Sequence, residues 1–130
     1  MLGLPIEIIG IDIDADPAGV RNRVTTILRE LADEVGLEAG PLEQKIIIDA
    51  DYSAGAYGRA DAATVEAVTM AASLEALTVD PVYSGKAFAA LLGLSRSGRL
   101  SRSDRVLFLH TGGAPALYAY RSLFAAGARS

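Results

Sequence analysis

Two tyrosines and a serine stand where side chains could carry acid-base chemistry. Tyr57 lies in a loop after one expected strand, and Tyr83 and Ser84 follow another extended stretch. Because the carboxyl ends of parallel strands meet at one edge of a sheet, both phenols could reach the same crevice. A phenol with a pKa of about 10 is a base at neutral pH only if a nearby cation favours the phenolate. From the residues alone, half-buried tyrosines with hydrogen-bonded hydroxyls and a serine N-cap are the simpler interpretation.

A second group of polar residues lies at positions 110–113, which read HTGG. Thr111 can cap a following helix, and Gly112 and Gly113 allow a tight turn. Such a turn at a helix N-terminus can also bind an anion, so a plain anion-binding α/β module is one hypothesis for the whole chain. His110 is predicted to end a buried strand with its ring hydrogen-bonded.

Alternating aspartates at positions 12, 14 and 16 suggest a metal site, but the spacing argues against one. An EF-hand loop starting at Asp12 requires glycine and glutamate at places where Pro17 and Arg23 stand. The chain has no cysteine, so it has neither disulfides nor thiolate ligands. We therefore interpret the three aspartates as strand-end and capping residues.

Composition limits the classes of partner. The net charge is -4 and the twelve lysines and arginines are scattered, which argues against a nucleic-acid surface. The hydrophobic content is 51%, yet no run approaches the roughly 18 apolar residues that suggest a membrane span. The first six residues are too short for a signal-peptide core, so we expect a cytoplasmic protein. The apolar excess predicts surfaces made for a partner.

The elements that must position these residues alternate between strand and helix. Strands are expected at residues 7–14, 45–49 and 105–110, with a further extended stretch at 78–83. Helices are expected at residues 17–35, 62–77 with Asp61 as its cap, 84–94, and 114–124 after a turn at 111–113, with a loop at 36–42 and a disordered tail at 127–130. This alternation predicts an α/β fold with a parallel sheet.

Longer motifs carry a more specific signal than single residues. Residues 80–86 read DPVYSGK and residues 106–113 read VLFLHTGG. Shorter matches occur in the same order, IGID at 9–12, AYG at 56–58, SLE at 73–75, APAL at 114–117 and AY at 119–120. From about Ile8 to its end, the chain resembles the C-terminal part of the family that contains D-cysteine desulfhydrase and 1-aminocyclopropane-1-carboxylate deaminase, which are pyridoxal phosphate enzymes of fold type II.

The resemblance implies a three-layer parallel sheet of the tryptophan synthase β-like kind, incomplete in this chain. Residues 1–130 would be the C-terminal part of the cofactor domain. In the family, the lysine that bonds pyridoxal phosphate belongs to the N-terminal part, which the chain lacks. Lys86 is therefore interpreted as structural or as a distant charge, and Lys45 as a solvated strand end.

The resemblance also implies roles for the polar residues. Tyr83 and Tyr57 would be catalytic, lining the substrate site for proton transfer or carboxylate contact. Ser84 and Thr111 would contact the cofactor, with Ser84 facing the pyridine nitrogen. At these two positions the deaminase has glutamate and leucine, whereas the desulfhydrases have threonine in place of Ser84 and the same HTGG pattern. A neutral hydroxyl suits α,β-elimination better than ring opening.

The expected function is thus a pyridoxal phosphate-dependent lyase that eliminates sulfide from a small amino acid such as D-cysteine, giving pyruvate and ammonia. One alternative is 1-aminocyclopropane-1-carboxylate deaminase activity. Another is a non-catalytic subdomain, or a subunit that completes its site with another chain. The expected partners are a small amino-acid substrate and either a homo-oligomer or the missing N-terminal part.

Overall fold

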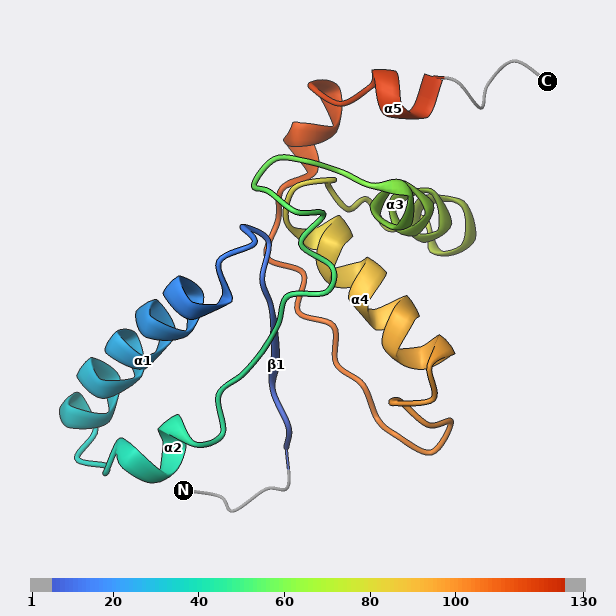
Figure 1. Ribbon diagram of the computed structural model, residues 1–130. Helices are drawn as coiled ribbons and strands as arrows, with labels where there is room; N and C mark the ends of the chain where they lie inside the picture. The colour runs from blue at the N-terminus through green and yellow to red at the C-terminus, as the bar shows by residue number, and fades with distance from the viewer. Residues whose placement is uncertain (1–5, 126–130) are drawn as a thin grey trace.

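The centre of the molecule is a short parallel sheet. The computed structural model describes residues 6–125. Strands β1 (Ile9–Ile11) and β2 (Ile47–Asp49) pair with Ile9 opposite Ile47 and Ile11 opposite Asp49. Helix α1 (Pro17–Glu34) and the four-residue helix α2 (Gly40–Glu43) connect the two strands, as a parallel pair requires. Both strands run toward the loops that carry the polar residues (Figure 1).

Helix α1 begins where the sequence predicts it. The side chain of Asp16 accepts a hydrogen bond of 2.9 Å from the backbone N–H of Gly19, and Pro17 occupies the first turn. The apolar stripe of the helix is largely uncovered, because Ile27 and Leu31 are 62% and 54% exposed. Helix α2 lies within the segment predicted as a loop, so that prediction was incomplete.

The core lies between α3 (Ala62–Glu75) and α4 (Ser84–Arg96), which pack against one another (Figure 1). Asp61 caps α3 by accepting a 2.8 Å hydrogen bond from the N–H of Thr64. Val68, Ala71 and Val79 form the buried cluster, with Phe88 and Phe108 packed around it. The two phenyl rings meet edge to face, with centroids 5.5 Å apart.

The prediction of a strand at residues 105–110 is wrong for the described chain. The segment predicted as an extended stretch at 78–83 has no regular element at 78–80 and forms a turn at 81–83. A strand needs a hydrogen-bonded neighbour, and the described sheet contains only β1 and β2. Residues 107–110 keep the alternation of a strand, since Leu107 and Leu109 are 89% and 76% exposed while Phe108 packs on the core. This segment therefore has the side-chain pattern of a strand without the backbone hydrogen bonds to a neighbouring strand.

The final helix predicted after the turn at 111–113 and running to Phe124 is wrong as a single helix. The chain instead forms the 3₁₀ helix η1 (Ala114–Tyr118) and the short helix α5 (Ser122–Ala125). The predicted turn is present, because Gly113 has a φ of +98° before η1 and Pro115 stands in its first turn. The predicted tail at 127–130 lies outside the described residues.

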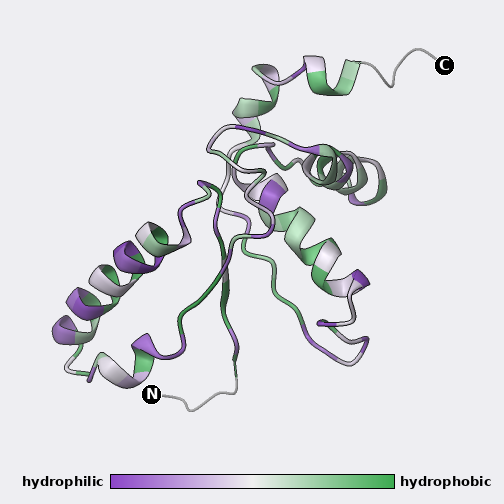
Figure 2. Ribbon diagram, viewed as in Figure 1, coloured by the Kyte–Doolittle hydropathy of each residue, from purple (hydrophilic) through white to green (hydrophobic). Residues whose placement is uncertain are grey.

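Apolar surface is abundant on the described chain, as its composition predicts. Large apolar side chains are exposed just before β1, on α1 and on the 105–110 segment, including Ile8 at 75%. Figure 2 shows hydrophobic residues along β1 and through the middle of α4. Among the described helices, none combines the length and the hydropathy that a membrane crossing requires.

Candidate functional site

Asp80 organises the polar turn before α4. Its side chain is fully buried, and its carboxylate accepts hydrogen bonds from the backbone N–H groups of Val82 (2.7 Å), Tyr83 (2.8 Å) and Ser84 (2.9 Å). The Ser84 hydroxyl donates a further bond of 2.6 Å to Oδ1. Burial alone would raise the pKa of Asp80, but these hydrogen bonds outweigh burial and lower it. Sequence reasoning missed this residue, although an aspartate that precedes Pro81 in a turn motif is a usable signal.

Ser84 connects this turn to the segment at 110–113. Its Oγ accepts a 3.0 Å bond from the N–H of Asp80 and lies 3.3 Å from the carbonyl oxygen of Gly112. Gly113 packs so closely that an added Cβ would lie 2.3 Å from Asp80 Oδ1. The two sequence motifs are therefore in direct contact, and Thr111 lies exposed beside this junction.

The two candidate catalytic tyrosines meet. The hydroxyls of Tyr57 and Tyr83 are hydrogen-bonded to one another. Their rings lie edge to face with centroids 5.8 Å apart and an interplanar angle of 69°. Tyr57 is 56% exposed and Tyr83 is 43% exposed, so both phenols are open to a bound molecule. The loop after β2 and the turn before α4 thus place two exchangeable protons at one point.

The hydrogen bond to Tyr83 is the largest cause that raises the pKa of Tyr57 above its ordinary value of 10.0, and desolvation adds to it. A raised pKa means that the phenol keeps its proton at neutral pH. A role as base therefore needs a cation that the described residues do not bring to this hydroxyl, whereas a role as proton donor needs none.

We expect the Tyr83→Phe variant to shift the ionisation of Tyr57 to lower pH, because the variant lacks the hydroxyl that holds the proton. Absorbance titration of tyrosinate from pH 8 to 12 would measure this shift. The matched control is Tyr118→Phe, since Tyr118 is 86% exposed and should only remove one ordinary titration step. A titration of the remaining tyrosines that matched the control would show that the two hydroxyls do not interact.

His110 and the lysines occupy structural positions. The Nε2 atom of His110 lies 2.8 Å from the carbonyl oxygen of Thr78, and Nδ1 accepts a 3.0 Å bond from the N–H of Gly112. The tautomer with its proton on Nε2 satisfies both partners. The hydrogen-bonded ring predicted for His110 is confirmed, although no strand ends there. Lys45 is exposed as predicted, whereas Lys86 is fully buried on three carbonyl oxygens.

The aspartates have the capping and strand-end positions predicted for them. Asp12 is fully buried after β1 and accepts a bond from the N–H of Asp14, and Asp16 caps α1. Within residues 6–125, no group of three or more histidine or acidic side chains gathers as metal ligands would.

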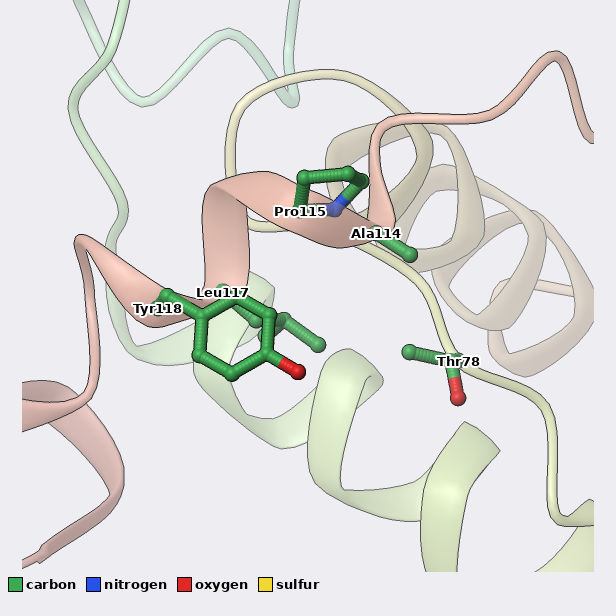
Figure 3. A pocket seen from close by; sticks show the side chains of 5 residues that line it. All are labelled: Thr78, Ala114, Pro115, Leu117 and Tyr118. Atoms are coloured by element: carbon green, nitrogen blue, oxygen red, sulfur yellow. The ribbon is translucent and has the colours of Figure 1, made fainter.

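A hollow next to η1 does not coincide with these residues. It is lined by Thr78, Ala114, Pro115, Leu117 and Tyr118, and Figure 3 shows their side chains around it. The walls are mostly apolar, and none of the four predicted site residues belongs to them. We therefore take the junction of the two motifs and the tyrosine pair, not this hollow, as the candidate site.

Known proteins are similar to this chain over most of its length. Residues 3–112 match the family described as pyridoxal-phosphate dependent enzyme. The chain is 38% identical to 1-aminocyclopropane-1-carboxylate deaminase of Burkholderia cenocepacia over 121 residues, which are 93% of this chain and 36% of the deaminase. It is 36% identical over 124 residues to the probable deaminase of Schizosaccharomyces pombe, covering 95% of this chain and 37% of that protein. The chain thus spans about a third of the length of these curated relatives.

Proposed function

Since the chain belongs to the pyridoxal-phosphate dependent enzyme family, we propose that it builds the substrate-facing side of a lyase site that eliminates sulfide from a small amino acid. Family membership gives the fold type II architecture and dependence on pyridoxal phosphate. D-cysteine is the proposed substrate, with pyruvate, ammonia and sulfide as products. The observation that carries this proposal is the environment of Ser84.

The residues around Ser84 fit the neutral ring edge of the cofactor. A hydroxyl has one proton and two lone pairs. The Ser84 oxygen uses one lone pair to accept a hydrogen bond from the N–H of Asp80, and its proton is donated to Asp80 Oδ1. One lone pair of the oxygen therefore remains. Ser84 can accept a hydrogen bond from a protonated ring nitrogen through that lone pair, or donate one to an unprotonated ring nitrogen by turning its proton away from Asp80. In both cases the hydroxyl brings no charge. When bound, pyridoxal phosphate supplies an electron sink for bond breaking at the Cα atom of an amino acid.

The tyrosine pair would act on the substrate. Two exposed hydroxyls that share a hydrogen bond can hold a proton close to a leaving group or bind a carboxylate. The raised pKa of Tyr57 favours the protonated phenol, which can protonate departing sulfur. Thr111 is proposed to lie along the same cofactor edge as Ser84, because both adjoin the carbonyl group of Gly112.

Deaminase activity on 1-aminocyclopropane-1-carboxylate is the second candidate. The names of the relatives favour it, because the similar proteins from Burkholderia cenocepacia and Schizosaccharomyces pombe are called deaminases or probable deaminases. The serine at position 84 favours elimination instead, since the resemblance places glutamate there in the deaminase. One substitution at this position can therefore separate the two candidates.

We expect the protein that carries this chain together with the family's cofactor-bonding lysine to release sulfide and pyruvate from D-cysteine. We expect Ser84→Glu to lower this turnover by about tenfold or more, because a buried carboxylate would favour the protonated form of the ring nitrogen and repel Asp80. Sulfide release and keto-acid formation, measured side by side with both substrates, would check this.

The control is Ser95→Glu, which adds the same charge at an exposed position on α4. Keto-acid formation from 1-aminocyclopropane-1-carboxylate without sulfide from D-cysteine would favour the deaminase. Equal turnover of Ser84→Glu and its control would show that Ser84 does not contact the cofactor.

The uncovered apolar surfaces are proposed to receive the rest of the family's domain. Leu107 and Leu109 project from a segment with a strand's alternation and no ladder partner among the described residues. An added strand would satisfy its backbone and cover those side chains. In this proposal, the remaining two thirds of a family member's length can belong to the same polypeptide or to a partner chain.

A further inference from the structure

Lys86 has the surroundings of a bound cation. Its side chain is fully buried, and Nζ donates hydrogen bonds to the carbonyl oxygens of Ile13 (2.8 Å), Ser53 (2.6 Å) and Ala56 (2.9 Å). An ammonium group has three N–H donors, so these acceptors use all of them. The three carbonyl groups come from the segment after β1 and from the loop after β2, which are far from α4 in sequence.

Carboxylates oppose the cost of burying the Lys86 charge. Burial lowers the pKa of Lys86, and the charges of Asp61, Asp12 and Asp14 reduce that shift without cancelling it. Asp12 is also fully buried, and its Oδ2 atom has no hydrogen-bond partner among the described residues. The geometry still matches an ammonium group, because three carbonyl acceptors meet three N–H donors and a neutral amine has only two.

The loop that Lys86 holds is the one that carries Tyr57. Two of the three acceptors, Ser53 and Ala56, flank a turn in which Ala54 and Gly55 have φ angles of +58° and +78°. A positive φ strains an alanine, so the turn needs outside support. The acceptor at Ala56 is the residue directly before Tyr57.

We propose that Lys86 is a positioning residue, a tethered cation whose three carbonyl bonds hold the loop after β2 so that the Tyr57 hydroxyl meets Tyr83. The part of this inference that concerns catalysis rests on the proposed function, but the part that concerns the loop does not. Replacing Lys86 by alanine removes the ammonium group but leaves a cage of the same three carbonyl oxygens. That cage should then accept a free primary ammonium ion.

The test uses the Lys86→Ala variant of the full chain and propylammonium, which replaces the three carbons and the ammonium group that the substitution removes. Arg59 is exposed in the same loop, so trypsin cleavage after it reports loop opening. We expect cleavage after Arg59 to become roughly tenfold or more faster in Lys86→Ala. Cleavage after Arg102, in a distant exposed turn, serves as the internal reference.

Propylammonium should slow the cleavage of Lys86→Ala after Arg59 in a saturable way, and 1-propanol should not. Lys86→Met fills the space without a donor, so it should be cleaved as fast as Lys86→Ala and should not respond to propylammonium. The tyrosinate titration of Tyr57 should move to lower pH in Lys86→Ala and return with propylammonium. The exposed Lys45→Ala variant should match the parent chain in every measurement.

Parent-like cleavage of Lys86→Met would overturn the proposal, because packing alone would then hold the loop. Equal protection by propanol and propylammonium would overturn it as well. If Lys86→Ala unfolds globally, the test becomes its thermal unfolding midpoint. Propylammonium must then raise this midpoint more for Lys86→Ala than for the parent chain. Neither readout needs the cofactor, so a failed lyase assay leaves this result intact.

Discussion

We expect the Asp80→Ala variant to lose about 3 to 5 kcal/mol in the free energy of unfolding. The substitution leaves the N–H groups of Val82, Tyr83 and Ser84 without their acceptor at the buried start of α4. Each buried donor without a partner costs about 1 to 3 kcal/mol, and relief of the buried charge returns only part of this sum. Urea unfolding of the 130-residue chain, followed by circular dichroism, would measure the loss.

The control is Asp104→Ala, because Asp104 accepts one backbone N–H, that of Ser101, in an exposed turn. Its loss should stay below about 1 kcal/mol. The effect of Asp80 should also depend on pH. Because folding lowers the pKa of Asp80, its stabilisation is complete above the unfolded pKa of about 3.9 and is lost as pH falls through the lower folded pKa. Equal stability of the two variants at pH 7 would contradict the role given to Asp80.

We expect Gly85→Ala to cost about 3 kcal/mol, although alanine is the better helix former. An added Cβ would lie 2.3 Å from the carbonyl oxygen of Asp80 and 2.7 Å from Cγ2 of Val68. The first neighbour is backbone, so it cannot move aside without opening the turn that holds Ser84. Helix α4 would have to shift away from α3 and from the site. The thermal unfolding midpoint would record the loss.

Gly40→Ala is the matched control for this substitution. Gly40 starts α2, and an added Cβ would meet no atom within 4 Å. Alanine there should leave the stability unchanged or raise it by up to about 1 kcal/mol. If both variants melted at the same temperature, the close approach of α4 to Asp80 would be wrong.

The long helices could be predicted from the sequence because each has local signals. Asp16 with Pro17 marks the start of α1, and Asp61 marks the start of α3. Strands have no such local origin, since their backbone bonds go to a neighbour elsewhere. Residues 105–110 therefore carry a strand's side-chain pattern without forming one. The last helix was predicted as one continuous element because the pattern of apolar residues does not reveal the break after η1.

The candidate site, like the fold, could be predicted only in part from the sequence. The order of the motifs predicted Tyr57, Tyr83, Ser84 and Thr111 as site residues. Tyr57 is hydrogen-bonded to Tyr83, and Ser84 is hydrogen-bonded to Asp80 and contacts the carbonyl group of Gly112. Their roles in catalysis stay predictions. Asp80 was missed as an organiser, and Lys86 was interpreted only as structural or as a distant charge, because charged residues are rarely fully buried and sequence gives no measure of burial. Their importance appears only when the carbonyl and N–H groups around them are known.

The hydrogen bonds that build the site have a consequence for folding kinetics. The bonds from Lys86 join residues 73, 33 and 30 positions apart, and the bond from the Tyr120 hydroxyl to the carbonyl oxygen of Gly58 spans 62 positions. Closing such long loops carries an entropic cost before any contact repays it, whereas the helices form from local contacts. The tyrosine pair therefore assembles late on the folding pathway, after α3 and α4, and chains halted before that step are helical but lack the site.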